Sequence, residues 1–131
     1  MNKINARELG ENILEDLKNY PERILTDRLI LVKDEMSNLV LTYSICMAQN
    51  QEEKVGEVLL ASDGEILYGI KSNCRNKGYM TEALMGLLEM SDNDHYLEIG
   101  DNNKESQKVA KKAGFQKSKT IGNVHIYRKN T

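Results

Sequence analysis

Two basic residues and a glycine stand close together in the segment from Cys74 to Met80, between an apolar run and a helical pattern. Arg75 and Lys77 supply positive charge, and Gly78 removes a side chain where an anion would approach the backbone. Backbone N–H groups at a helix start lack intrahelical partners and attract anions. The segment therefore predicts a loop that binds a diphosphate, although an ordinary strand-to-helix turn uses the same residue types.

A ligand-binding loop of this kind needs a strand before it and a helix after it. Branched residues run from Ile66 to Ile70, and the preceding pair Asp63-Gly64 is typical of a tight hairpin with a strand at Val55 to Ala61. From Gly78 to Met90 the apolar residues recur every three or four positions, which predicts a helix. Two more helices are predicted, one at Asn5 to Tyr20 that Asn5 caps and Pro21 ends, and one at Glu105 to Ala113 that Gly114 closes. The other predicted strands are Arg28 to Val32, Leu39 to Met47, Tyr96 to Ile99, Phe115 to Thr120 and Val124 to Arg128.

The composition predicts one domain over residues 1–131, and its predicted helices and strands give the α/β class. A chain of 131 residues that is 40% hydrophobic is large enough for one core and leaves little room for two. It contains no apolar run of the ~20 residues needed to cross a bilayer, and its first residues, MNKINARELGEN, contain no signal-peptide pattern. Cys46 and Cys74 lack the spacing and partners of a zinc site. We therefore expect a cytoplasmic protein with reduced thiols and no metal.

The charges are unevenly distributed along the chain. From Asn103 to Thr131 eight basic residues stand against one acidic residue, so this segment carries +7 within a chain of net charge −2. Such a segment suits a polyanionic ligand, but a solvated helix face has the same composition. Nucleic-acid binding is disfavoured because aromatic residues are not interleaved with the basic ones.

The sequence ILYGIKSNCRNKGYMTEAL resembles the acetyl-CoA segment of the GCN5-related N-acetyltransferases, the GNAT family. Arg75 and Gly78 match the loop motif Q/R-x-x-G-x-G/A, with Met80 in place of the final small residue. The segment from Thr26 to Leu31 resembles the first strand of the ribosomal-protein alanine acetyltransferase branch. The resemblance covers the chain after Pro21 and leaves residues 1–21 outside it. A second block, N-x-x-S-x-x-x-A-x-K-x-G-F, is matched by Asn103, Ser106, Ala110, Lys112, Gly114 and Phe115.

This resemblance implies a single-domain GNAT fold, with a mixed, mostly antiparallel sheet of about seven strands flanked by helices. The fourth and fifth strands, at Ile66 to Lys71 and His95 to Ile99, would splay apart and hold the pantetheine arm of acetyl-CoA. The implied contacts to this donor are Ile70, Lys71 and Ser72 along the pantetheine, Arg75, Asn76, Lys77, Gly78, Tyr79 and Met80 on the diphosphate, and Asn103 and Ser106 on the cofactor arm.

Acetyl transfer by direct attack on the thioester needs a neutral amine, but an amine of pKa ~10.4 is almost fully protonated at neutral pH. Glu57 on the third strand is the predicted base, acting through water, although an outward-facing strand glutamate would look the same. Glu98 is the second choice. The backbone N–H near Ile70 would stabilise the oxyanion, as it does in the family. Many relatives place a tyrosine where Ala110 stands, so Ser106 is the predicted acid for the leaving thiolate.

The acceptor side departs from the family. Relatives have one or two helices between the first two strands, and this chain has only Lys33 to Asn38 there. The shortened region implies an open acceptor site, or one covered by the N-terminal helix or a second subunit, in a monomer or homodimer. The expected function is N-acetyltransfer from acetyl-CoA to a primary amine, either a protein N-terminus or a small amine. The alternative is a catalytically weakened module that binds acyl-CoA or a protein.

Overall fold

The first five strands form one antiparallel sheet in sequence order. In a computed structural model, which describes residues 17–37, 39–91 and 93–129, these strands are β1 (Arg23–Leu25), β2 (Leu29–Met36), β3 (Val40–Met47), β4 (Asn50–Ala61) and β5 (Ile66–Ile70). Gly64 in the β4–β5 turn has φ +98°, and the Asp63 carboxylate accepts a hydrogen bond from the Glu65 N–H at 2.9 Å. The predicted hairpin at Asp63-Gly64 is therefore confirmed.

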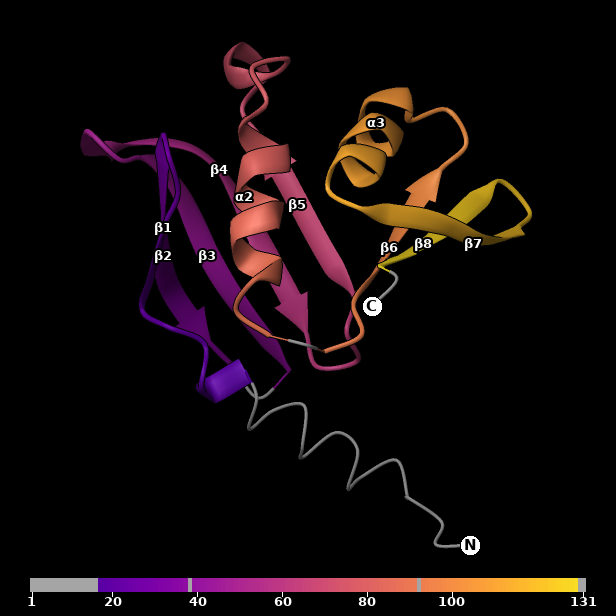
Figure 1. Cartoon of the computed structure of the whole chain (residues 1–131), viewed down its shortest axis with the longest axis horizontal. Helices are drawn as coiled ribbons and strands as arrows, with labels where there is room; N and C mark the ends of the chain where they lie inside the picture. Colours follow the sequence, from indigo (N-terminus) through magenta and orange to yellow (C-terminus); the bar gives the residue numbers. More distant parts are fainter. Residues whose placement is uncertain (1–16, 38, 92, 130–131) are drawn as a thin grey trace, which may run out of the picture.

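A second, three-stranded sheet has the order β6-β8-β7, from β6 (Tyr96–Gly100), β7 (Phe115–Ile121) and β8 (Val124–Lys129). The two sheets meet at one parallel bridge between Glu65 and Tyr96, and from this point β5 and β6 diverge (Figure 1). The predicted α/β class and the splayed strand pair are confirmed. The described residues form eight strands in two sheets where about seven strands in one sheet were expected, because β1 is too short to leave a pattern and the splay interrupts pairing.

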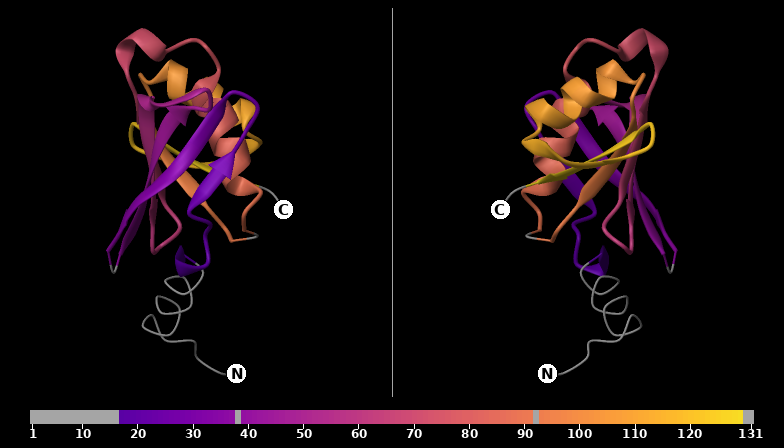
Figure 2. Two further views of the ribbon diagram at one scale, coloured as in Figure 1. Left: turned by 90° about the vertical axis from the view of Figure 1, so that its left-hand side faces the viewer. Right: turned by 90° about the vertical axis from the view of Figure 1, so that its right-hand side faces the viewer.

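Two helices follow β5 and β6. The helix α2 (Tyr79–Leu88) begins after a short 3-10 turn, η1 (Ser72–Cys74), and α3 (Lys104–Lys112) lies beside β6 and β7. Figure 2 shows α2 on one face of the five-stranded sheet, and no helix of the described residues covers the opposite face. None of the described helices is long and apolar enough to cross a membrane. As the periodicity predicts, the buried residues of α2 are Met80, Ala83, Leu84, Leu87 and Leu88.

The connection between β2 and β3 is shorter than the sequence indicated. The two strands extend to Met36 and from Val40, so most of the stretch Lys33 to Asn38 that was expected as a turn belongs to β2. Lys33 pairs with Tyr43 across this hairpin. Apart from residue 38, which is not described, the whole connection is strand or tight turn. The helices that relatives place here are therefore replaced by a hairpin.

The predicted N-terminal helix, with Asn5 as its cap, lies mostly outside the described residues. Its predicted end is anchored where the two sheets meet. The Tyr20 hydroxyl lies 3.1 Å from His95 Nε2, and His95 Nδ1 lies 3.1 Å from the Gly64 carbonyl oxygen. Because that carbonyl can only accept, Nδ1–H is the donor and Nε2 accepts from Tyr20. Burial lowers the pKa of His95, which favours this neutral form.

Candidate functional site

The loop between η1 and α2 contains two residues in the left-handed region. Asn76 has φ +63°, and Gly78, which precedes the first turn of α2, has φ +79°. No side chain caps this end of α2, so the first N–H groups of the helix are available to a ligand. Left-handed residues in such loops turn backbone N–H groups toward a common anion. The local geometry therefore suits the predicted phosphate-binding role of Arg75 to Met80.

An arginine immediately before β2 holds this loop against α2. Arg28 Nε lies 2.7 Å from Glu82 Oε1, and its NH1 donates to the Lys77 carbonyl oxygen at 2.9 Å. The guanidinium lies 4.7 Å from the ring centroid of Tyr79. Burial alone would raise the pKa of Glu82, but hydrogen bonds from Thr26 and Arg28 outweigh this effect and lower it. Sequence reasoning missed this clamp, because its ion pair joins residues 54 positions apart.

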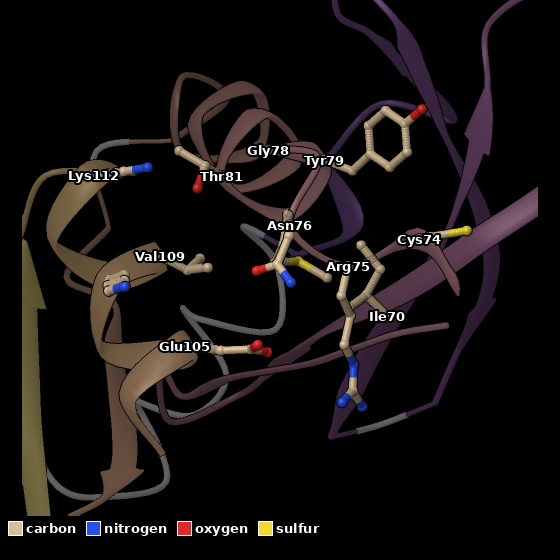
Figure 3. A pocket seen from close by; sticks show the side chains of 12 residues that line it. Ile70, Cys74, Arg75, Asn76, Gly78, Tyr79, Thr81, Glu105, Val109 and Lys112 are labelled. Carbon is tan, nitrogen blue, oxygen red and sulfur yellow. The ribbon is translucent and has the colours of Figure 1, made fainter. Parts of the chain in front are cut away.

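A cavity of about 320 Å³ opens between this loop, the start of α2 and α3. Figure 3 shows Asn76 between Ile70 and the side chains of α3, with Lys112 and Thr81 at one end. Three basic side chains among the lining residues provide the charge that a diphosphate requires. The lining residues are Ile70, Cys74, Arg75, Asn76, Gly78, Tyr79, Met80, Thr81, Glu105, Lys108, Val109 and Lys112.

A second cavity, of about 180 Å³, fills the gap between β5 and β6. Asn103 and Ser106 reach it from the start of α3, where Asn103 Oδ1 also caps the helix by accepting from the Ser106 N–H at 3.1 Å. The cavity is polar at one end, where burial first, and then the nearby Glu98 and Asp63 carboxylates, raise the pKa of Glu65. Its lining residues are Glu65, Ile66, Leu67, Tyr68, Leu97, Glu98, Ile99, Gly100, Asn103 and Ser106.

The two cavities separate the predicted site residues into two groups. Ile70, Arg75, Asn76, Gly78, Tyr79 and Met80 line the first cavity, and Asn103 and Ser106 line the second. Lys71, Ser72 and Lys77 are exposed residues next to the first cavity and do not line it. Met80 is only 4% exposed and belongs to the core, although it also lines the first cavity.

The predicted base, Glu57, lines neither cavity. It is exposed on β4, and one carboxylate oxygen lies 3.5 Å from Lys54 Nζ. Its register partner on β5 is Gly69, where an added Cβ would meet nothing within 4 Å. Space is therefore open beside Glu57 on the face of the sheet opposite α2. Within residues 17–37, 39–91 and 93–129 no three His, Cys, Asp or Glu side chains gather as metal ligands.

Comparisons with known proteins agree with this geometry. A model of the acetyltransferase (GNAT) domain matches residues 12–116, whereas no curated protein gives a match. A solved GNAT-family protein from Bordetella pertussis has a TM-score of 0.70 at 15% identity, covering 84% of this chain and 100% of that one. An acetyltransferase from Agrobacterium tumefaciens has a TM-score of 0.70 at 13% identity, with 83% and 94% covered. RimL, a ribosomal L7/L12 alpha-N-protein acetyltransferase solved with coenzyme A, has a TM-score of 0.67 at 14% identity, with 82% and 97% covered.

The solved neighbours therefore share the fold over most of this chain. The family match spans more than half of the chain and includes the loop, α2 and α3. The chain therefore belongs to the GNAT family of acetyltransferases, whose members transfer the acetyl group of acetyl-CoA to an acceptor amine.

Proposed function

We propose that this enzyme acetylates a primary amine on a protein N-terminus, with the acceptor approaching the open gap between β5 and β6. The observation that carries the proposal is that residues of β5 and α3 line two cavities, one beside the loop from Arg75 to Met80 and one in this gap on the side of Glu98. Because a tight hairpin joins β2 and β3, no helix of the described residues narrows the approach. A bulky acceptor fits such a face better than a small amine, which needs enclosing walls.

For the donor, we propose that the backbone of Ile70, Lys71 and Ser72 follows the pantetheine and that the loop binds the diphosphate. Ile70 lines the first cavity at the end of β5, where the strand has no hydrogen-bonded neighbour on its β6 side. Its position supports the proposed stabilisation of the oxyanion by the Ile70 N–H. Lys71 and Ser72 connect that strand to the loop residues, which we propose are Arg75, Asn76, Lys77, Gly78, Tyr79 and Met80.

The proposed binding mode is tested by calorimetric titration with acetyl-CoA, dephospho-CoA and ATP. Micromolar binding of acetyl-CoA, about −8 kcal/mol, with weaker binding of the other two, is the expected result. Equal binding of all three would mean a general polyanion surface. A panel of acceptors then follows: a peptide with a free N-terminus, the same peptide with a blocked N-terminus and one lysine, and small amines. Donor binding without turnover on any of them would support the weakened binding module instead.

We propose Glu57 as the base that deprotonates the acceptor through water. The carboxylate lies on the strand next to β5, so the distance to the gap is on the order of 5–10 Å, which water molecules can bridge. Replacing Glu57 by glutamine is expected to lower kcat about 10²-fold at neutral pH and to remove the acidic limb of the pH–rate profile. Glu53→Gln, on the same strand, is the matched control.

The competing assignment is Glu98, which lines the second cavity. An unchanged profile in Glu57→Gln together with a lost limb in Glu98→Gln would transfer the role to Glu98. For the leaving group, two hydroxyls line the same cavity, those of Ser106 and Tyr68. We propose Ser106 as a contact on the cofactor arm and as one of these two possible proton donors.

Location and assembly complete the proposal. The thiols of Cys46 and Cys74 form no disulfide, which suits the reducing cytoplasm. A monomer would leave the open face to the acceptor, whereas a homodimer would cover part of it. Sedimentation of the protein with and without a peptide acceptor distinguishes these two states.

A further inference from the structure

We propose that Tyr68 donates the proton that the sulfur of coenzyme A takes up when the thioester breaks. This inference rests on the proposed acetyl transfer and assigns one of its steps to a residue outside both motif blocks. It is carried by the place of Tyr68 in the second cavity, next to residues that line the first, and by the loose hydrogen bond of its hydroxyl.

Tyr68 lines the second cavity, two residues before Ile70, which lines the first. On β5, the residues from Ile66 to Tyr68 line the second cavity and Ile70 lines the first. On α3, Ser106 lines the second cavity and Val109 the first. The Tyr68 hydroxyl, 3.4 Å from the Ser106 carbonyl oxygen, reaches from β5 to α3 between these pairs. A donor whose diphosphate lies in the first cavity and whose arm reaches Asn103 and Ser106 in the second must pass this hydroxyl, so we infer that its thioester lies beside the phenol.

The hydroxyl of Tyr68 is held weakly. Its 3.4 Å contact exceeds the 2.5–3.0 Å usual for O–H···O hydrogen bonds, so little is lost when it turns to another acceptor. The other well-placed tyrosine hydroxyls are engaged elsewhere: Tyr43 donates to the Pro21 carbonyl, and Tyr96 donates to Asp63 at 2.8 Å. Tyr68 is the tyrosine that lines the second cavity.

The protonation state of the phenol fits the role. Burial raises the pKa of Tyr68, and the contact to Ser106 offsets only part of this effect, so the hydroxyl keeps its proton at neutral pH. A serine hydroxyl such as that of Ser106 is a much weaker acid than a phenol.

In this step the amine nitrogen forms the bond to the carbonyl carbon, and the carbon–sulfur bond breaks with its electron pair going to sulfur. The proton of Tyr68 Oη moves to that sulfur and yields the thiol of coenzyme A. The proton released by the attacking amine passes through water and restores the phenol. No oxidant, reductant or metal is required.

The first test replaces Tyr68 by phenylalanine, which keeps the ring and removes only the hydroxyl. We expect kcat to fall about 10²-fold, near the lower end for loss of a general acid because a thiolate is a fair leaving group. The calorimetric affinity for acetyl-CoA should change by less than about twofold, since the ring contacts remain. Tyr127→Phe is the matched control: its hydroxyl is buried without a hydrogen-bond partner among the described residues, and it lines neither cavity.

The second test identifies the titrating group. Wild-type enzyme should lose activity at alkaline pH as Tyr68 ionises, and this limb should disappear in Tyr68→Phe. Incorporation of 3,5-difluorotyrosine at position 68 should shift the limb to lower pH, because fluorine makes the phenol more acidic. Ser106→Ala keeps the carbonyl that Tyr68 contacts, so its alkaline limb should match that of the wild type.

The outcomes separate this inference from the proposed function. No turnover by the wild type on any amine overturns the function itself. Turnover by the wild type with an unchanged rate and pH profile in Tyr68→Phe overturns only the role of Tyr68. A large loss of acetyl-CoA affinity in Tyr68→Phe, with kcat retained, would make Tyr68 a binding residue and also overturn the proposal. Loss of the alkaline limb in Ser106→Ala would mean that the limb does not report the ionisation of Tyr68, and it would overturn the proposal.

Discussion

Replacing Gly56 by alanine is expected to lower the free energy of unfolding by about 3 kcal/mol. A Cβ at this position would lie 2.4 Å from the Gly69 carbonyl oxygen and 3.1 Å from Ile70 Cα, both backbone atoms of β5. No flexible side chain can move away to relieve this overlap, so β4 and β5 must separate. Urea denaturation followed by circular dichroism measures the change.

The same substitution should also weaken the donor site. Gly56 pairs with Ile70, and the neighbouring Val55 carbonyl accepts a hydrogen bond from the Lys71 N–H at 2.8 Å. Displacement of β5 therefore moves the backbone proposed to contact the pantetheine, and acetyl-CoA affinity should fall at least tenfold. Gly69→Ala is the control, because a Cβ there meets nothing within 4 Å, and it should alter stability by less than about 0.5 kcal/mol. Equal stability of the two variants would contradict the argument.

Local patterns predicted those parts of the fold that depend on neighbouring residues. Asp63-Gly64 indicated a hairpin, and the structure has Gly64 at φ +98° there. Gly114 was expected to be left-handed after α3, and its φ is +97°. The loop from Arg75 to Met80 was recognisable because glycine and basic residues immediately precede an amphipathic helix. In each case the chemistry that produces the structure lies within a few residues of sequence.

Features that depend on distant residues could not be predicted in this way. The strand β1 has three residues, and it is defined only by its pairing with β2. Glu57 and Glu98 both occupy outward-facing positions on their strands. Only the divergence of β5 and β6 places Glu98 at a cavity. Tyr68 fits a strand pattern like any aromatic residue. Its place in the second cavity follows from the packing of α3, which starts more than 30 positions later.

Replacing Arg28 by methionine is expected to weaken acetyl-CoA binding about tenfold, or about 1.4 kcal/mol. Methionine keeps much of the side-chain length but loses the ion pair with Glu82, the hydrogen bond to the Lys77 carbonyl and the contact with Tyr79. The loop would then no longer be held in its binding geometry. The free energy needed to order it would therefore reduce the affinity for the donor. The expected effect is moderate, because the Arg28 side chain is 46% exposed and solvent screens its charge.

The structure contains a close counterpart of this clamp for comparison. Arg128 NH1 lies 3.1 Å from Asp94, and its guanidinium lies 5.1 Å from the Tyr96 ring centroid, far from the loop in sequence and on the other sheet. Arg128→Met removes the same kinds of contact and the same charge, and it should leave acetyl-CoA affinity within about twofold of the wild type. Equal losses in both variants would mean that net charge, and not the clamp, controls donor binding.

The effect of Arg28→Met on stability should depend on pH. Hydrogen bonds from Thr26 and Arg28 lower the pKa of Glu82 in the folded protein despite its partial burial. Its carboxylate therefore stabilises the fold above the unfolded pKa of about 4.5, and this contribution is lost as the pH falls through the lower folded value. The stability difference between wild type and Arg28→Met should be largest near pH 7 and shrink below pH ~4.5. A difference that stays constant over this range would mean that Arg28 acts through packing on Tyr79, because packing does not titrate.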